Sequence, residues 1–486
     1  MDFRRYYSPL ILPGTAIFAL LWAVARACVQ SITIDEADTY LVWVARHDPS
    51  QWEAASNNHV LNSLLMRLFT SVFGVSHLSV RAPALLGAAL YIFAAYLLCR
   101  KLTPGLRVQW PVFVCLVYNP FVFDHLVAAR GYALALGFMM GLLAIAAYTR
   151  LDVAACALCS VCAALSFAAN FSFAFVNAFA MLAILIWACA RTQAAQTRVR
   201  FLGACALPGL LVSVFLSVPA VLHWPKGQLE YGAHSLREMF ATVAQASLYR
   251  LNPQIVNPML YQLLEHAKPF LLPALLVLAV WQWIRWRPAI SGALLGILAA
   301  TVGAHWLLLK VFHVSLPMDR TAIWIVPLCV LAIGAAAANR RALTVMLYVM
   351  SFYFVLCLRL NYFKEWDWDA DVNKIYPVLA WYNHTYGVKD VASNWQYGAA
   401  LNFYRVQSGG ESFGEIESPV QLPTDRSLYV LNYPFDEDFI KQQHLRVVYH
   451  APNTDAVVAV RPEAEAQWQG VPRGATRAAR AAISLN

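Results

Sequence analysis

The chain has 486 residues, of which 60% are hydrophobic and only 13% charged, and its mean hydropathy is +0.53. This composition excludes an ordinary soluble domain and indicates a polytopic α-helical membrane protein whose surroundings are the lipid bilayer. The net charge of +9 does not indicate a nucleic-acid partner, because the basic residues form short clusters between apolar runs and no single basic patch.

A membrane-crossing helix needs about 20 mostly apolar residues, and a window of that length predicts about eleven spans. The predicted spans cover residues 9–28, 82–99, 108–123, 131–148, 153–170, 172–190, 201–222, 269–284, 289–309, 321–338 and 342–358. Lysine and arginine gather at every second junction, which predicts a cytoplasmic N-terminus. These junctions contain Arg4, Arg5, Arg100, Lys101, Arg107, Arg150, Arg191, Arg198, Arg200, Arg285, Arg287, Arg340 and Arg341. With an odd number of spans, the C-terminal region is expected outside the cytoplasm.

Two long loops are predicted on the same outer side. The first covers residues 29–81 and contains apolar positions at helical spacing from Val60 to Phe73, which predicts an amphipathic helix lying in the membrane interface and ending at Gly74. The second covers residues 223–268 and contains another amphipathic stretch at 236–248. Long loops of this kind are often functional, so the second loop is either a lid, an acceptor-contact loop or a plain connector.

The composition changes abruptly after the last predicted span. Residues 1–360 are expected to form the transmembrane domain, and residues 361–462 a small extracytoplasmic α/β domain with β-rich pieces at 427–431 and 445–448. The Ala- and Arg-rich remainder, residues 463–486, is expected to be weakly ordered.

An acidic cluster, Asp35-Glu36-Ala37-Asp38, directly follows the first predicted span. Ionised groups at the membrane surface serve chemistry, transport or docking. No phosphate-binding Gly-x-x-x-x-Gly-Lys-Ser/Thr loop accompanies the cluster, so a nucleotide-driven helicase is excluded. Because ATP is absent from the outer side, a reaction there needs a substrate that is already activated, and a sugar linked to a lipid phosphate is the natural candidate.

Transfer of such a sugar needs a base for the acceptor hydroxyl and cations for the phosphate leaving group. Arginine suits the second task because its planar fork donates two hydrogen bonds at once. The outward-facing candidates are Asp35, Glu36, His59, Arg81, Asp124, His125, Arg130 and Arg320. Simpler roles stay open for each: the arginines at span entrances could extend to lipid headgroups, Asp124 and His125 could cap a helix, and the acids could form a solvated loop face.

Several ordered blocks resemble GT-C glycosyltransferases of the protein-mannosyltransferase and lipid A aminoarabinose-transferase type. The resemblance extends over roughly residues 1–340. Its blocks are Ile34 to Tyr40, Asn58 to Leu65 with Phe73-Gly74, Val80 to Gly87, Pro120 with Ala129 to Leu134, and Pro317 with Arg320 and Pro327. Two positions depart from the family pattern, since Val60 follows His59 and Gly131 follows Arg130 where proline is frequent.

The resemblance implies roles for individual residues. It implies that the acidic pair holds the catalytic base, with Asp35 as the base and Glu36 as an acceptor or metal contact. It implies that His59, Arg81, Arg130 and Arg320 lie near the phosphate and sugar of the donor, and Tyr132 follows Arg130 in the family pattern. The predicted substrate-binding residues also include Asn58, Asp124 and His125. No cofactor is required, although a divalent ion could bind to oxygen ligands of Asp35 and Glu36.

The sequence therefore predicts an inverting glycosyltransferase that takes a sugar from a polyprenyl-phosphate donor. The acceptor is a lipid, a glycan or a protein, and the site lies at the outer face of a prokaryotic cytoplasmic (inner) membrane. A transporter or flippase of lipid-linked glycans is the alternative from another class, although its spans would be expected to carry deep charges and pseudo-symmetric halves. A glycan polymerase or ligase is a third possibility, which a pyrophosphate-linked donor would distinguish.

Overall fold

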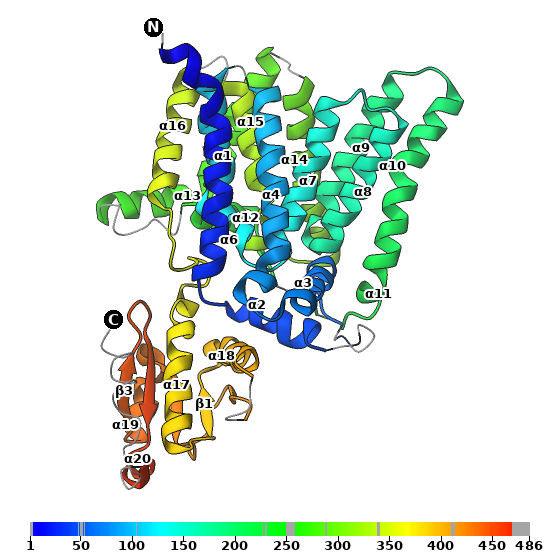
Figure 1. Ribbon diagram of the computed structural model, residues 1–486. Helices are drawn as coiled ribbons and strands as arrows, with labels where there is room; N and C mark the ends of the chain where they lie inside the picture. Colours follow the sequence, from blue (N-terminus) through cyan, green and yellow to red (C-terminus); the bar gives the residue numbers. More distant parts are fainter. Residues whose placement is uncertain are drawn as a thin grey trace. The chain divides into compact units, whose positions relative to one another are not determined.

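The structure is a computed structural model, which describes residues 3–46, 48, 52, 54–103, 105–225, 227–228, 231–248, 258–286, 289–337, 341–409 and 414–468. Most of the described chain is helical, with one small sheet (Figure 1). It divides into two compact units. The first unit consists of Met1–Ala27, Glu53–Phe69 and Arg81–Leu360, and the second of Cys28–Trp52, Thr70–Val80 and Asn361–Asn486.

The first unit is a bundle of apolar helices, several of which run side by side (Figure 1). The bundle helices and their short connecting helices are α1 (Phe3–Val29), α3 (Val60–Phe73), α4 (His77–Leu102), α5 (Leu106–Val117), α6 (Pro120–Val127), α7 (Tyr132–Tyr148), α8 (Val153–Ala169), η3 (Phe171–Phe173), α9 (Ala174–Ala190), α10 (Ala195–Leu216), α11 (Val218–Val221), α12 (Leu236–Ser247), α13 (Pro258–Trp286), α14 (Ala289–Phe312), η4 (Asp319–Ala322), α15 (Ile325–Ala337) and α16 (Arg341–Leu356). The ends of α1, α3 and α4 pass into the second unit.

Each predicted span corresponds to helical structure, but not every helix is long enough to cross a bilayer. Within the described residues, six helices are long and apolar enough to do so, or seven if one bent pair counts as a span. The helices α7, α8, α15 and α16 are apolar but shorter. The structure therefore supports a multi-pass membrane protein, while the number eleven stays a prediction.

The third predicted span, residues 108–123, is not one straight helix. It is broken into α5 and α6, whose axes differ by 57°. Pro120 occupies the first turn of α6, and the residue before a proline is kept out of the helical region, which gives Asn119 an extended backbone. The Asn119 side chain accepts hydrogen bonds from the backbone N–H groups of Phe121 and Val122, so the break is also the start of a capped helix.

The two expected amphipathic helices are present at the predicted positions. Helix α3 occupies Val60–Phe73, and Gly74 ends it with a φ of +75°, a conformation that glycine adopts without strain. Helix α12 begins at Leu236, where the Ser235 side chain caps it by accepting from the Glu238 N–H. Helix α13 begins at Pro258, earlier than the predicted span at 269, so the second loop is shorter than expected. Residues 249–257 of this loop lie outside the described residues.

The second unit combines a four-stranded sheet with short helices. Its elements are α2 (Ile34–Asp38), the π-helix η1 (Thr39–Val44), η5 (Asp367–Asp369), α17 (Val372–Tyr386), β1 (Val391–Ser393), α18 (Trp395–Gln407), β2 (Leu428–Asn432), α19 (Tyr433–Gln442), β3 (Arg446–His450), β4 (Ala456–Val460) and α20 (Pro462–Trp468). The strand order is β1-β2-β4-β3, with β1 parallel to β2 and the other pairs antiparallel. Strands β2 and β4 are buried along their whole length, as their continuous apolar sequences indicate.

Two details of this unit differ from the sequence expectation. The acidic segment after α1 belongs to the same compact unit as the C-terminal region, and α2 packs against α18. Helix α20 extends beyond residue 462, and its Trp468 ring stacks on Tyr386 with centroids 5.4 Å apart. The rest of the predicted tail, residues 469–486, lies outside the described part of the chain.

Candidate active site

The acidic cluster of the second unit begins a short helix, α2. Thr33 caps that helix: its hydroxyl accepts from the Glu36 N–H at 3.2 Å, and the Glu36 carboxylate accepts from the Thr33 N–H at 3.0 Å. This reciprocal capping box satisfies two backbone donors at the helix start. Glu36 is fully buried, so its carboxylate has a structural partner inside the segment itself.

Asp35 has a different partner, although it is the next residue along the chain. Its Oδ2 atom accepts a hydrogen bond from the indole Nε1 of Trp366 at 3.0 Å. One turn further on, the Asp369 Oδ2 atom accepts from the backbone N–H of Ile34 at 2.7 Å. Trp366 and Asp369 were not among the predicted site residues. Their signal in the sequence was the run Trp366-Asp367-Trp368-Asp369, where aromatic and acidic residues alternate.

Asp369 is a buried carboxyl group close to other acids. Burial is the main cause that raises its pKa well above the ordinary aspartate range. The hydrogen bond from the Ile34 N–H lowers that pKa, whereas the charges of Asp35, Glu36 and Asp367 raise it. The Asp369 carboxyl therefore favours its neutral, protonated form.

The first unit gathers three predicted aromatic residues. Tyr132 begins α7, and its ring lies 4.9 Å from the ring of His125 and 5.6 Å from that of His59, measured between centroids. His125 is held by its own helix, because its Nδ1 lies 2.9 Å from the carbonyl oxygen of Phe121. All three predicted residues are at most 5% exposed. The predicted block from Asn58 to Leu65 and the predicted block from Ala129 to Leu134 therefore lie close together in the fold.

Arg130 and Asn58 are buried in the same region. The Arg130 guanidinium donates to the side-chain oxygen of Asn57, and Asn58 accepts from the Ser63 hydroxyl at 2.9 Å. The Asn62 amide donates to the Ala129 carbonyl at 2.9 Å, which ties α3 to the segment that carries Arg130. These contacts fix the start of α3 against the turn that precedes α7.

Gly131 explains one departure from the family pattern. Its φ is +76°, which proline cannot adopt because its ring holds φ near −65°. A Cβ atom on Gly131 would lie 2.1 Å from the Ala169 carbonyl oxygen and 3.0 Å from the His59 Cβ. The turn between Arg130 and Tyr132 therefore requires glycine here.

Arg81 and Asp124 both have partners on or beside α1. Arg81 is fully buried and donates to the carbonyl oxygen of Ala27 at 3.1 Å, so it does not extend towards lipid headgroups. Asp124 forms an ion pair with Arg26 at 2.6 Å. Arg26 was not among the predicted site residues, although a charge inside the first predicted span was a usable signal.

Arg320 lies in η4 and is partly exposed. The N–H of Asp319, whose φ is +47°, donates to the Thr242 hydroxyl of α12 at 3.2 Å. Helix η4 also contacts η3, which begins two residues after the Ala169 that lies against Gly131.

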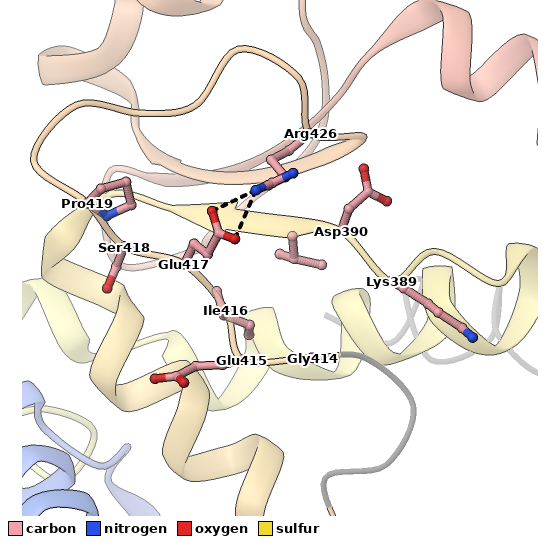
Figure 2. Close-up of a pocket in the computed structure, with 10 residues that line it drawn as sticks. Lys389, Asp390, Gly414, Glu415, Ile416, Glu417, Ser418, Pro419 and Arg426 are labelled. Carbon is pink, nitrogen blue, oxygen red and sulfur yellow. Dashed lines mark hydrogen bonds and ion pairs between the residues drawn. The ribbon is translucent and has the colours of Figure 1, made fainter.

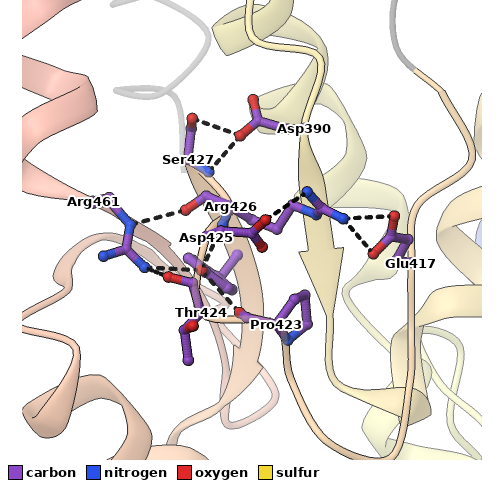
Figure 3. A network of polar contacts seen from close by, with 9 residues as sticks. Asp390, Glu417, Pro423, Thr424, Asp425, Arg426, Ser427 and Arg461 are labelled. Carbon is purple, nitrogen blue, oxygen red and sulfur yellow. Dashed lines mark hydrogen bonds and ion pairs between the residues drawn. The ribbon is translucent and has the colours of Figure 1, made fainter.

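A separate polar cavity of about 720 Å³ opens beside β1 in the second unit (Figure 2). Its lining includes Lys389, Asp390, Glu417 and Arg426 but none of the residues that hold α2. Arg426 binds both oxygens of Glu417 at 2.9 Å, and Asp390 accepts from the N–H and hydroxyl of Ser427 (Figure 3). These bonds join the segment before β2 to the residues around β1. The cavity is not part of the candidate site.

The sequence leaves a divalent ion possible at the acidic pair, Asp35 and Glu36. In the described residues, no group of three or more His, Cys, Asp or Glu side chains is arranged to hold a metal ion. Glu36 closes the capping box and Asp35 accepts from Trp366, so different partners hold the two carboxylates.

No protein-family model and no curated protein matches the sequence. Among solved structures, the crystal structure of ArnT from Cupriavidus metallidurans in the apo state aligns with 93% of this chain and 97% of its own, with 12% identity and a TM-score of 0.53. The chain has the ArnT fold. ArnT is a GT-C superfamily member, so the resemblance suggested by the sequence blocks is confirmed at the level of the fold.

Two further structures align over most of the chain with lower scores. ArnT bound to undecaprenyl phosphate covers 93% of this chain and 97% of its own, with 13% identity and a TM-score of 0.42. The archaeal oligosaccharyltransferase AglB from Archaeoglobus fulgidus, in complex with an inhibitory peptide and a dolichol-phosphate, covers 98% of this chain and 76% of its own, with 11% identity and a TM-score of 0.44.

Proposed function

We propose that the chain is an integral membrane glycosyltransferase that moves a sugar from a polyprenyl-phosphate donor to a lipid, glycan or protein acceptor. The observation that carries the proposal is the ArnT fold over 93% of the chain, in which the blocks shared with GT-C transferases hold buried acidic and arginine side chains. The proposed site is at the outer face of a prokaryotic cytoplasmic membrane, with inversion at the anomeric carbon.

In the proposed reaction, Asp35 accepts the proton of the acceptor hydroxyl as its oxygen attacks the anomeric carbon. The bond between that carbon and the phosphate oxygen breaks, and polyprenyl phosphate leaves with the bonding electrons. Arg81, Arg130 and Arg320 are assigned to the phosphate, because a guanidinium keeps its charge when buried and can bind two phosphate oxygens. Asn58, His59, Asp124, His125 and Tyr132 are assigned to the donor sugar and its surroundings.

Glu36 receives a secondary role in this proposal. Its carboxylate closes the capping box of α2, whereas Asp35 is partly exposed and accepts a hydrogen bond from the Trp366 indole. A base must reach the acceptor hydroxyl, which favours Asp35 over the fully buried Glu36.

The test is transfer of a labelled sugar from a polyprenyl monophosphate by purified wild type, Asp35→Asn and Asp425→Asn. Asp425 is the matched control, since its side chain is 72% exposed and lies outside the candidate site. We expect Asp35→Asn to lose about 10²-fold or more of the activity and Asp425→Asn to match wild type. Full activity of Asp35→Asn would overturn the assignment of the base.

The donor and the reaction class have their own outcomes in the same assay. Activity only with a pyrophosphate-linked glycan would replace the proposal by a glycan polymerase or ligase. Flipping of a lipid-linked sugar across vesicles by wild-type protein, without transfer to any acceptor, would replace it by a flippase.

A further inference from the structure

The start of α2 is held by side chains from distant parts of the second unit. Three successive backbone N–H groups have side-chain acceptors: Ile32 donates to the Tyr404 hydroxyl at 3.0 Å, Thr33 to Glu36 at 3.0 Å, and Ile34 to Asp369 at 2.7 Å. The first backbone donors of a helix have no partner within the helix, so such acceptors determine where the helix begins. The position of Asp35 therefore depends on residues of the C-terminal region.

The Trp366 side chain is fixed independently of its contact with Asp35. It is 2% exposed, and its ring meets that of Phe363 edge to face, with centroids 5.8 Å apart. An indole nitrogen can only donate a hydrogen bond, so the bond to Asp35 favours the ionised carboxylate. The geometry thus directs a rigid donor at one oxygen of the candidate base.

A second indole in the same segment, that of Trp368, has no such hydrogen bond to α2. Trp368 lies in η5, two residues further along, and its Nε1 is buried without a hydrogen-bond partner among the described residues. A buried indole nitrogen in this segment therefore does not by itself donate to α2. Of these two indoles, Trp366 is the one whose N–H donates to the acidic cluster.

We propose that Trp366 is a positioning residue for the transfer reaction, and that its N–H orients the Asp35 carboxylate and maintains it in the ionised form. The inference rests on the proposed function, in which Asp35 is the base. Asp369 assists by accepting the Ile34 N–H and so fixing the helix start. The segment from Phe363 to Asp371 thereby becomes part of the active site, although the sequence resemblance ends near residue 340.

The environment of Asp35 determines the direction of the expected effect. The titratable groups on α2, η1, η5, α18 and the start of α4 are Glu36, Asp38, Tyr40, Asp367, Asp369, Tyr397, Tyr404, Arg405 and His77. Nearby carboxylates disfavour a further negative charge on a carboxyl group, whereas a hydrogen-bond donor such as the Trp366 indole favours it. Removal of the donor should therefore raise the pH at which Asp35 becomes an effective base.

The experiment compares Trp366→Phe with Trp368→Phe in the full-length protein. Phenylalanine keeps an aromatic ring at each position but has a smaller ring without an N–H donor. For Trp366→Phe we expect kcat to fall about tenfold and the acidic limb of the pH profile to move up by about one pH unit. The KM for the donor and the profile of Trp368→Phe should stay as in wild type.

A second measurement does not need activity. Because the indole donor stabilises ionised Asp35, the difference in melting temperature between wild type and Trp366→Phe should increase as the pH rises through the titration of Asp35. Trp368→Phe should show a difference that does not depend on pH. This comparison remains informative when Trp366→Phe is too weakly active for a full pH profile.

The two proposals fail in different ways. If Asp35→Asn keeps full transfer activity, the base assignment is wrong and the role of Trp366 falls with it. If Asp35→Asn is inactive but the acidic limb of Trp366→Phe coincides with that of wild type, the positioning role is wrong and the proposed function stands.

Discussion

Arg26 of α1 and Asp124 of α6 form an ion pair of 2.6 Å although they are 98 positions apart in the sequence. Neither side chain is more than 4% exposed, and the guanidinium also lies over the ring of Phe123, 5.4 Å from its centroid. The pair joins the first helix of the bundle to the bent segment after α5. It also gives Asp124 a structural partner beside any role towards the donor.

Breaking this pair should destabilise the protein strongly. We expect Arg26→Met to lower the free energy of unfolding by about 3–5 kcal/mol, because it removes one partner of a buried ion pair. The double variant Arg26→Met with Asp124→Leu should recover most of that loss. Unfolding of the detergent-solubilised protein measures the stability of the single and the double variant. A single variant as stable as wild type would contradict the expectation, and the activity of the folded double variant tests whether Asp124 also contacts the donor.

Gly131→Ala should destabilise the turn before α7 much more than an ordinary glycine substitution. The cost combines about 1–2 kcal/mol for a side chain at positive φ with the displacement of Ala169 or His59. Gly105→Ala is the matched control: its φ is +71° and a Cβ there would have no atom within 4 Å. We expect a loss of about 3 kcal/mol or more at Gly131 and about 1 kcal/mol at Gly105. Equal shifts of the two melting temperatures would disprove the predicted clash.

The capping box predicts different outcomes for two Glu36 variants. Glu36→Gln keeps an oxygen that can accept the Thr33 N–H, whereas Glu36→Ala removes it. If Glu36 is structural, Glu36→Gln should keep transfer activity within about tenfold of wild type, and Glu36→Ala should be destabilised by about 1 kcal/mol, as for other lost caps. Thr33→Ala should show a similar loss of stability. A Glu36→Gln variant as inactive as Asp35→Asn would instead assign Glu36 to the chemistry.

The raised pKa of Asp369 predicts how stability depends on pH. Because burial raises this pKa above its unfolded value of about 3.9, the folded protein binds the proton more tightly than the unfolded chain. The contribution of Asp369 to stability is therefore present at low pH and is lost as the pH rises from about 4 through the folded pKa.

Asp369→Asn removes this titration and keeps an oxygen to accept the Ile34 N–H. Its free energy of unfolding relative to wild type should therefore increase as the pH rises from about 4 to 8. Asp425→Asn, at an exposed position, is the control. An Asp369→Asn curve parallel to that of wild type over this range would show that Asp369 does not titrate in this way.

Local features were predicted well because their causes lie within a few residues. The helix from Val60 to Phe73 follows from apolar residues at helical spacing, and its end follows from Gly74. The buried strands at 428–432 and 456–460 have continuous apolar sequences, and the first was expected close to its observed limits. A hydropathy window does not detect a bend, so the break before Pro120 was not predicted, although its cause is equally local.

The sequence by itself determined the apolar helical class, the ordered blocks that indicated a GT-C fold, and the acidic pair after the first span. The resemblance ranked Asp35 before Glu36 as the base, and the tertiary structure added the partner that holds Asp35. The hydrogen bonds from Trp366 to Asp35 and from Ile34 to Asp369 span 331 and 335 positions of the chain. Contacts over such separations arise when the chain packs and leave no periodic pattern in the sequence. Two adjacent carboxylates can therefore look equivalent in sequence and have different partners in the fold.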